Sequence, residues 1–339
     1  NVTVKGLKEN MDETLAFVQE ILLNPSFEPS EIEIDRKSMI TRLEMNRSEP
    51  ASVAAQAMTK ALNGHKSSSP LAFKTIDAQI DGLKKVSQPR LQKLHSSLLD
   101  FSNAYIAVVG GVEPEAFSNK LAQRFSDVSG DVQFQKLPTA ANEPSGLKQW
   151  IETPDKANAQ LYIAHMADVN PRSEDYFATY IANQIFGGGG FASRLMQRIR
   201  VQEGYSYGTG SGIATEYDRD QAQFYMYAIA APENMKKVVE AYNEEVQKVL
   251  DSGFTEEEMK NAIEGALKSM RVTWSNDGYI GRMLNENKQT GRDINWYKEY
   301  QQKLESLTLD EVHAAFKKHI VRDDINVFAA GDWAKLNKK

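Results

Sequence analysis

The sequence predicts a fold of mixed helices and strands in which one structural unit occurs twice. Segments with a helical spacing of apolar residues alternate with short strand-like runs, and several pairs of segments recur at a separation of roughly 220 residues. The length of 339 residues also suits two domains, because a domain usually holds roughly 100 to 200 residues.

The composition narrows the classes of protein that remain possible. Hydrophobic residues make up 41% of the chain and charged residues 25%, as in ordinary globular proteins. The net charge of -6 argues against a basic nucleic-acid binder, and no apolar run approaches the roughly 20 residues that span a bilayer. The absence of Cys removes disulfides, thiolate catalysis and thiolate zinc sites.

The first copy begins with a strand-like stretch, Val2 to Lys5, and an amphipathic helix that opens at Glu9. A second helix begins near Phe27, where a hydroxyl residue and carboxylates favour a helix start. Further along, Ser87 is placed to cap a helix, and the apolar run Tyr105 to Gly110 predicts a buried strand.

The second copy repeats this order. Its matching segments are the strand Phe224 to Ile229, a helix from Glu233, a second helix from Phe254, a helix capped by Thr308 and the strand Ile325 to Gly331. Chance rarely sustains such a correspondence over so many segments. The chain therefore contains two copies of one unit.

The second copy has additional material before its shared part. This material predicts a strand near Gln160 to Val169, a helix Ser173 to Phe186, a glycine loop, another helix, and a strand Tyr207 to Ala214 joined to the next strand by a turn with Glu216, Asp218 and Asp220. Either the first copy lacks these elements or they lie upstream in a longer parent, and the alternative is an insertion into the second copy. We predict a partial first domain over 1–128, a Pro- and Gly-containing linker over 129–148 and a complete second domain over 149–339.

A run of four glycines, Gly187 to Gly190, precedes a helix start. Backbone amides there could bind an anion. A dinucleotide-binding loop follows a strand, however, whereas Ser173 to Phe186 predicts a helix. We therefore expect a tight connection between two helices with close backbone approach.

Arg200 and Tyr207 lie at the end of the helix that follows the glycines. Leu195, Met196 and Ile199 predict the buried side of that helix. A guanidinium and a phenol brought together here would suit a peptide carbonyl or a carboxylate. The plain alternative is an exposed Arg and a half-buried Tyr without a ligand.

The chain has five histidines: His65, His95, His165, His313 and His319. No two are three or four residues apart, so no helix presents two imidazoles on one face as the common zinc motifs require. We expect them to be surface or capping residues. A serine nucleophile is not indicated either, because the surroundings of Ser206 do not match G-x-S-x-G.

The stretch from Arg200 to Gly208 resembles the pitrilysin/insulinase family of zinc metallopeptidases. In that family an Arg and, seven residues later, a Tyr follow a Gly-rich loop and a Ser-Arg-Leu helix start. These are Arg200 and Tyr207 here, after Gly187 to Gly190 and Ser193-Arg194-Leu195. The resemblance covers most of the chain and includes Asn24 to Phe27, Val109 to Val112 and Phe254 to Met259.

The resemblance implies an α+β fold of tandem homologous domains, each a mostly antiparallel sheet with helices packed on one face, with the first copy truncated at its amino end. The family binds zinc through H-x-x-E-H on a helix and a distant Glu. The corresponding helix here, Ser173 to Phe186, has no His. The chain could then be the non-zinc carboxyl-terminal portion of a long member, which is favoured because Asn63 to Pro70 departs from the family's compact segment and Ala330 to Trp333 resembles the end of the long members. In a short member without its start, Glu44 would instead fall where the distant zinc ligand belongs.

The implied function is that of the substrate-binding, non-zinc part of a zinc-dependent metalloendopeptidase that cleaves peptides inside a two-half chamber. Arg200, Tyr207, Gly188 and Gly189 would bind the peptide, and this chain would hold neither a catalytic residue nor a cofactor, because zinc belongs to the complete enzyme. Expected partners are a peptide substrate and an amino-terminal zinc-bearing half or partner subunit, and neither nucleic acid nor a membrane span.

The bacterial periplasm or cell envelope is the expected compartment. The alternative function is that of a non-catalytic family member acting as a scaffold or peptide-binding partner of an active peptidase subunit.

Overall fold

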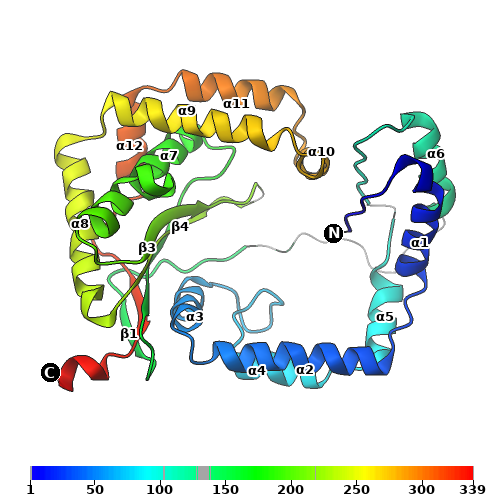
Figure 1. Ribbon diagram of the computed structural model, residues 1–339, viewed down its shortest axis with the longest axis horizontal. Helices are drawn as coiled ribbons and strands as arrows, with labels where there is room; N and C mark the ends of the chain where they lie inside the picture. Colours follow the sequence, from blue (N-terminus) through cyan, green and yellow to red (C-terminus); the bar gives the residue numbers. More distant parts are fainter. Residues whose placement is uncertain are drawn as a thin grey trace. The chain divides into compact units, whose positions relative to one another are not determined.

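The computed structural model describes residues 2–101, 104–126, 128, 137, 139–217 and 219–338. The chain divides into two compact units (Figure 1). Unit 1 comprises Asn1–Thr41, Ala78–Leu137 and Val272–Asp293, and unit 2 comprises Arg42–Asp77, Pro138–Arg271 and Ile294–Lys339. The domain boundaries predicted at 128 and 149 separate two homologous copies along the sequence. The two compact units are a different division of the chain, so these boundaries stay a prediction. Most of the predicted linker before residue 139, and Asp218 of the predicted turn, lie outside the described residues.

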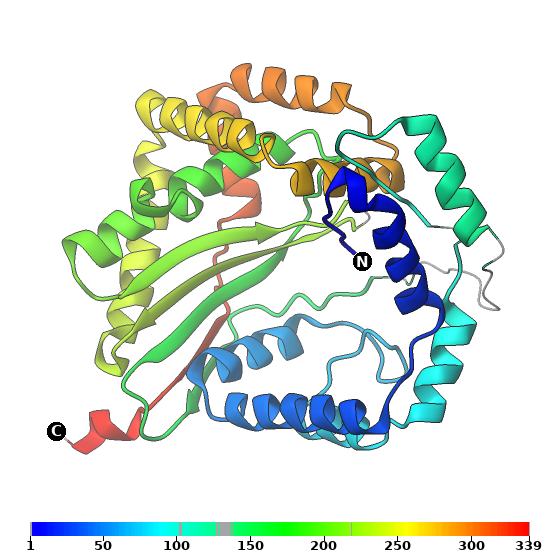
Figure 2. The ribbon, with the colours of Figure 1, turned by 45° about the vertical axis from the view of Figure 1, so that its right-hand side comes forward.

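Unit 2 contains a five-stranded sheet in the order β1-β5-β2-β4-β3. The strands are β1 (Lys148–Glu152), β2 (Ala159–Ala167), β3 (Gly208–Ala214), β4 (Ala222–Ala230) and β5 (Val327–Gly331). β1 pairs with β5 in parallel, and the β5–β2, β2–β4 and β4–β3 pairs are antiparallel. Figure 2 shows the long strands side by side. The prediction of a mostly antiparallel sheet is confirmed, and β1 is a strand that the sequence patterns did not predict.

Helices cover one face of this sheet and form the main core of unit 2. They are α7 (Tyr176–Asn183), α8 (Met235–Ser252), α9 (Glu256–Thr273), α11 (Asn295–Glu305) and α12 (Leu309–His319). The side chains of Phe224 and Met226 on β4 are fully buried in the same cluster as Phe186, Tyr242 and Phe316. The Phe186 ring meets the Tyr242 ring edge-on at 5.7 Å, a favourable geometry for aromatic packing. The α+β class is therefore confirmed.

The opposite face of the sheet is covered in part by α3 (Pro50–Leu62). Ala54, Met58 and Leu62 are buried at every fourth position, so they form one stripe of that helix. Met58 and Leu62 share a cluster with Phe328 of β5. The expected helix layer on one face is thus joined by a helix on the other, because α3 carries an apolar stripe of its own.

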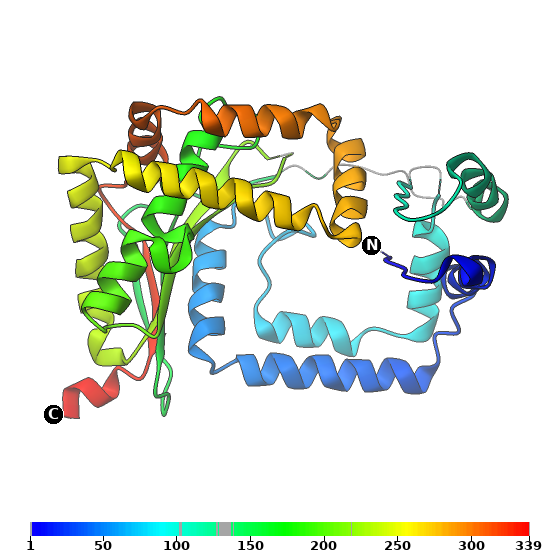
Figure 3. The same ribbon diagram turned by 45° about the horizontal axis from the view of Figure 1, so that its top comes forward.

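Unit 1 is mostly helical. Its helices are α1 (Met11–Leu23), most of α2 (Pro29–Asn46) and α4 (Ile76–Lys84), α5 (Gln88–Leu98), α6 (Pro114–Phe125) and α10 (Asp277–Thr290). α2 runs alongside α4 (Figure 3), and the Arg36 guanidinium of α2 donates to the carbonyl oxygens of Leu83 and Val86. His95 of α5 bonds the carbonyl oxygen of Leu22 at 2.8 Å. Polar contacts thus join helices that are far apart in sequence.

The predicted repeat is visible in the order of the helices. α1 and α8 both begin at a Met after a short 3₁₀ turn, and α2 and α9, which follow them, both have 18 residues. α5 and α12 both have 11 residues. Thr308 caps α12 through a reciprocal capping box with Glu311. The predicted cap at Ser87 differs, because its side chain makes no capping hydrogen bond.

The two strands predicted for the first copy are wrong. Val2 to Lys5 and Tyr105 to Gly110 have no strand assignment in the described chain, and the apolar side chains Val2, Val4 and Ile106 are exposed. A strand needs a neighbour to satisfy its backbone groups. In unit 2 the strands β2 and β1 pair with β5, whereas the first copy has no such neighbours among the described residues.

Candidate functional site

The glycine run begins inside one segment of π-helix in unit 2 and ends before a second one. α7 continues into a π-helical turn, η2 (Gln184–Gly188), followed by a 3₁₀ turn, η3 (Gly190–Ala192), and a second π-helix, η4 (Met196–Gln202). Leu195, Met196 and Ile199 are buried as predicted. π-helical turns are rare and frequently occur at functional sites. The predicted tight connection is therefore present, with π rather than α geometry on both sides.

Gly187 is the position where the chain approaches the sheet most closely. A Cβ atom at Gly187 would lie 2.3 Å from the Ser211 Oγ of β3 and 2.8 Å from a Leu195 methyl carbon. Ser211 in turn donates a 2.7 Å hydrogen bond to the Asn183 side chain. Only glycine fits here, because any side chain would separate η2 from β3.

Arg194 anchors the segment after the glycines to the turn between α8 and α9. Its guanidinium makes two hydrogen bonds to the Glu258 carboxylate, at 2.6 and 2.7 Å, and donates to the Gly253 carbonyl at 2.9 Å. Burial by itself raises the pKa of Glu258, but the hydrogen bonds from Arg194 and Thr255 lower that pKa overall. Paired bonds of this kind hold both position and orientation.

Arg198, one turn further on, is also held by carboxylates. It bonds Glu203, and it donates to Glu244 at 2.6 Å. Glu203 also accepts a hydrogen bond from the Tyr205 side chain, which is the largest cause of its lowered pKa, followed by Arg198. Both arginines that precede Arg200 on this segment are therefore engaged in fixing η4 to α8 and α9.

Arg200 differs from these two arginines. Within the described part of the chain it makes no ion pair, and its guanidinium carbon lies 5.0 Å from the centre of the Phe191 ring. Phe191, in η3, is itself 62% exposed. The stack leaves the guanidinium hydrogens available to a ligand while restricting its orientation.

Tyr207 lies just beyond the turn that follows η4. The Tyr205 amide donates to the Ile199 carbonyl at 2.9 Å, and Gly204 adopts a positive φ of 63°, so the chain turns at the end of η4. Tyr207 then donates its amide to Ile229 of β4 and leads into the edge strand β3. Its side chain is 66% exposed, not half-buried, and its hydroxyl has no hydrogen-bond partner among the described residues.

The other predicted site residues have different surroundings. Gly188 and Gly189 are exposed, but the Gly189 amide donates to the Gln184 carbonyl at 2.8 Å and is not free for a ligand. Glu44, on α2, is exposed and bonds Arg47 at 2.7 Å. Peptide binding by Gly188 and Gly189, and the alternative role of Glu44 as a distant zinc ligand, stay predictions.

The expectation that all the histidines are surface or capping residues is wrong for two of them. His165 and His319 are 6% and 1% exposed. His165 bonds the His319 carbonyl oxygen, and the His319 ring bonds Asp175 at 2.7 Å. Each faces a neighbouring element through a polar contact, which lets a polar ring be buried. By contrast, His313 accepts a hydrogen bond from the Phe254 amide at the start of the segment after α8.

The chain's own residues do not fit a catalytic zinc ion. α7, the helix that matches the zinc-binding helix of the family, carries no His. Across the described residues, no group of three or more His, Cys, Asp or Glu side chains is arranged to hold a metal ion. Zinc chemistry is therefore not assigned to this chain. The same part of the chain contains no helix long and apolar enough to cross a membrane.

Comparison with known proteins decides the family. Residues 85–266, more than half of the chain, match the peptidase M16 inactive domain. The chain belongs to the peptidase M16 inactive-domain family. This confirms the resemblance to the pitrilysin-type zinc peptidases and to their non-zinc carboxyl-terminal portion.

The curated relatives of this M16 chain include proteins named as peptidases and one named as a non-peptidase. It is 22% identical to the "Non-peptidase homolog YmxG" of Helicobacter pylori, over 96% of this chain and 73% of that protein. It is 21% identical to an "Uncharacterized zinc protease" of Rickettsia bellii, over 83% of this chain. It spans 65% of that protein and 57% of an uncharacterized zinc protease of Streptomyces coelicolor.

Solved structures share the fold of this M16 chain. A peptidase M16 inactive domain from Pseudomonas fluorescens superposes with a TM-score of 0.82 at 22% identity, covering 96% of this chain and 75% of that one. A Helicobacter pylori protease gives a TM-score of 0.80 at 13% identity, covering 96% of this chain and 78% of that one. At these identities the likeness establishes the fold alone.

Proposed function

We propose that this chain is the substrate-binding, non-zinc part of a zinc-dependent M16 metalloendopeptidase, and that Arg200 and Tyr207 bind the peptide backbone. The zinc-bearing part would be an amino-terminal half or a partner subunit, and the two together would enclose the peptide. The family membership supports the non-catalytic assignment. The binding role and the enclosing chamber are proposals.

The observation that carries the proposal is the contrast between three arginines on one short segment. Arg194 and Arg198 are bonded to carboxylates, whereas Arg200 is exposed and stacked on Phe191, with no acidic partner among the residues that the structure describes. A fold that needed Arg200 only for stability would be expected to pair it as it pairs the other two. An exposed guanidinium without an ion pair among the described residues, and an exposed phenol seven residues later, are donors suited to an external acceptor.

The chemistry follows from these two donors. Both can donate hydrogen bonds to peptide carbonyl oxygens, and the guanidinium can do so at two points. Near the scissile bond they would position the carbonyl and stabilise its developing negative charge. Loss of one such donor commonly lowers kcat by about 10² to 10³. No residue of this chain is assigned the activation of water.

The test measures peptide binding and cleavage separately. A fluorescent peptide should bind the chain more weakly after Arg200→Met or Tyr207→Phe, while the matched variant Arg271→Met, an exposed arginine near the end of α9, should bind as wild type does. The chain alone should not cleave the peptide. Zinc-dependent cleavage by the purified chain, or unchanged affinity in both site variants, would overturn the proposal.

A second candidate function is a scaffold for an active peptidase subunit. It is favoured by the similarity to a protein named a non-peptidase homolog, which extends over 96% of this chain. The two functions differ in what the complete assembly does. If Tyr207→Phe lowers turnover of the zinc-bearing partner, the chain takes part in the reaction. If turnover depends on the presence of the chain but not on Arg200 or Tyr207, it is a scaffold.

A further inference from the structure

A cavity of about 240 Å³ lies between α7 and the edge strand β3 in unit 2. One wall comes from α7 and η2, through Thr179, Tyr180 and Asn183, and the other from β3, through Ser211 and Ile213. Gly188, at the end of η2, lies on its boundary. Drug-sized ligands usually occupy about 300 to 1,000 Å³, so this cavity suits a smaller group such as one large side chain.

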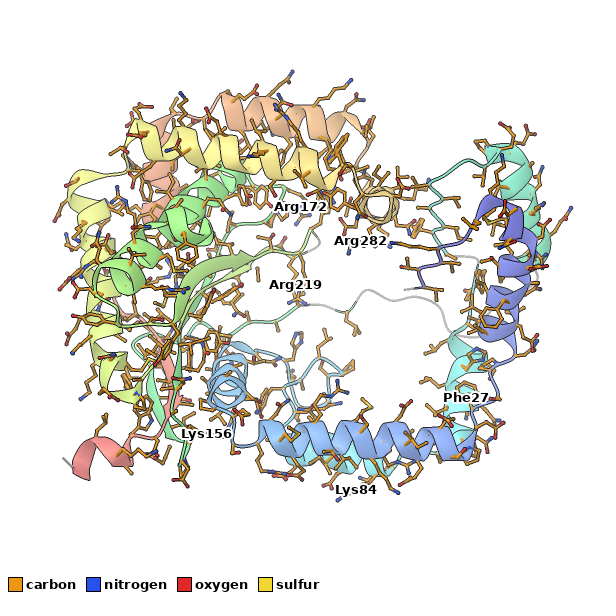
Figure 4. The ribbon with its side chains drawn as sticks, in the orientation of Figure 1. Phe27, Lys84, Lys156, Arg172, Arg219 and Arg282 are labelled. Carbon is orange, nitrogen blue, oxygen red and sulfur yellow. The ribbon has the colours of Figure 1, made fainter. Side chains whose placement is uncertain are left out.

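The walls of this cavity carry no ionisable carboxylate, ammonium, guanidinium or imidazole. They consist of Tyr, Thr, Ser, Asn, Gln, Gly and aliphatic residues, although a quarter of the chain is charged. The neighbouring loops do carry charges. Arg172 and Arg219, labelled in Figure 4, follow β2 and β3 and are bonded to Asp220 and Glu216. A charged group entering the cavity would lose part of its hydration without gaining an opposite charge from the walls.

Hydrogen bonds hold the walls in place. Ser211 of β3 donates to Asn183 of α7 at 2.7 Å, which joins the two walls. Thr179 donates to the Asp175 carbonyl at 2.7 Å. Burial raises the pKa of Tyr180, which shares a hydrogen bond with Tyr300 of α11. A cavity with fixed walls binds without the entropy cost of ordering them.

We propose that this cavity is a specificity pocket that accepts one large uncharged side chain, aromatic or amide, of the bound peptide. The inference rests on the proposed peptide-binding function and adds a second contact to it. Tyrosine rings at the rim can pack against an aromatic guest, and Asn183 and Gln184 can bond an amide or phenol. The pocket would read the charge of the guest side chain, whereas Arg200 and Tyr207 would contact the peptide backbone.

The strand β3 sets the distance between the two contacts. Tyr207 lies immediately before β3, and the cavity is lined by its later residues, Ser211 to Ile213. Tyr207 is thus four to six residues from the residues of β3 that line the cavity, and each residue of a strand adds about 3.3 Å. An extended peptide beside β3 has the same rise. The guest side chain should therefore lie about four to six residues from the peptide residue that contacts Tyr207.

The experiment uses fluorescent peptides that differ at a single guest position, with Tyr, Gln, Glu or Lys in an otherwise uncharged sequence. Moving the guest along the peptide locates the preferred position. At that position we expect Tyr and Gln peptides to bind the 339-residue chain at least about tenfold more tightly than Glu and Lys peptides. Equal affinity of all four guests at every position would overturn the pocket while leaving the Arg200 and Tyr207 proposal intact.

Gln184→Glu places a carboxylate in the cavity wall without changing its size. It should weaken the Tyr and Glu peptides and improve the Lys peptide, inverting the preference. Gln302→Glu, an equal change of charge at an exposed position of α11, should leave every affinity unchanged. Arg200→Met should weaken all guests by the same factor. The preference of the wild-type chain among the four guest peptides is measured without any variant. The proposal can therefore still be tested if Gln184→Glu does not fold. If no peptide binds, the proposed function and this inference both fail.

Discussion

The guanidinium carbon of Arg200 lies 5.0 Å from the centre of the Phe191 ring, and both side chains are on the surface of unit 2. Phe191 stands in the turn after the glycine run, and its carbonyl accepts a hydrogen bond from Gln197 of η4. The glycine loop and the arginine are thus linked through one exposed ring. Under the proposed function, Phe191 would position the Arg200 guanidinium.

We expect Phe191→Leu to raise the Kd for peptide about two- to fivefold, because a cation–π contact at an exposed site contributes about 0.5 to 1 kcal/mol. The melting temperature should stay unchanged, since the ring is exposed. Fluorescence anisotropy and thermal melting measure the two quantities. Val201→Ala removes another exposed apolar side chain of η4 and should change neither. An unaltered Kd in Phe191→Leu would contradict the positioning role.

The Arg194–Glu258 pair should matter for stability. The two side chains are 19% and 30% exposed, and Arg194→Met leaves a largely enclosed carboxylate without its partner. We expect a loss of about 2 to 4 kcal/mol in the free energy of unfolding, measured in urea. Arg172→Met breaks a pair whose partners are 47% and 93% exposed and should lose less than about 1 kcal/mol. Similar losses of unfolding free energy in both variants would show that the Arg194–Glu258 pair stabilises the chain no more than an exposed pair does.

Gly187→Ala should destabilise the chain by about 1 to 3 kcal/mol, because its Cβ would collide with Ser211 and Leu195. Gly265→Ala is the matched control. Gly265 is exposed within α9, and a Cβ there meets nothing within 4 Å. This second variant should stabilise the chain by about 0.5 to 1 kcal/mol, because alanine favours a helix. The two changes are thus expected to move the urea midpoint in opposite directions.

The stability of the chain should fall as the pH drops from about 6.5 to about 4. Burial lowers the pKa of His165 to about 4, with further lowering by Arg322 and His319, although the bond to the His319 carbonyl opposes it. An unfolded His has a pKa of about 6.5. Between pH 6.5 and pH 4 the His165 ring is therefore protonated in the unfolded chain but neutral in the native chain. This difference lowers the free energy of unfolding by up to about 3 kcal/mol, and the full loss is reached below about pH 4.

His165→Gln tests the source of this pH dependence. Glutamine keeps a hydrogen-bond donor for the His319 carbonyl but does not titrate in this range. Unfolding free energies measured in urea at a series of pH values should show a shallower slope for the variant between pH 6.5 and 4. The same slope in both proteins would assign the effect to other groups.

The secondary structure that follows from local patterns was predictable. Apolar spacing and capping residues near Glu233 and Thr308 predicted α8 and α12, and the repeat was visible from such segments alone. Two kinds of feature were not. Tyr105 to Gly110 has the composition of a buried strand but forms none, because pairing depends on a neighbour that composition does not reveal. His165 and His319 can be buried because their rings form hydrogen bonds with groups from segments that are distant in the sequence.

The candidate site divides in the same way. Arg200, Tyr207 and the glycine run were found in the sequence, because they lie within 21 residues of one another and follow a family pattern. The π-helical turns and the Phe191 stack are features of the folded chain. The carboxylates of α8 and α9 reach Arg194 and Arg198, and no ion pair forms at Arg200 within the described residues. No spacing in the sequence indicates which arginine a carboxylate will reach.

The sequence by itself predicted the α+β class and the family, because helical periodicity and short family motifs are local along the chain, and it predicted a repeated unit, which stays a prediction. Only the tertiary structure decided that Arg200 is left unpaired, that His165 is buried and that α7 and β3 enclose an uncharged cavity. Those features arise from contacts between segments tens of residues apart. These contacts form only when the sheet packs against its helices.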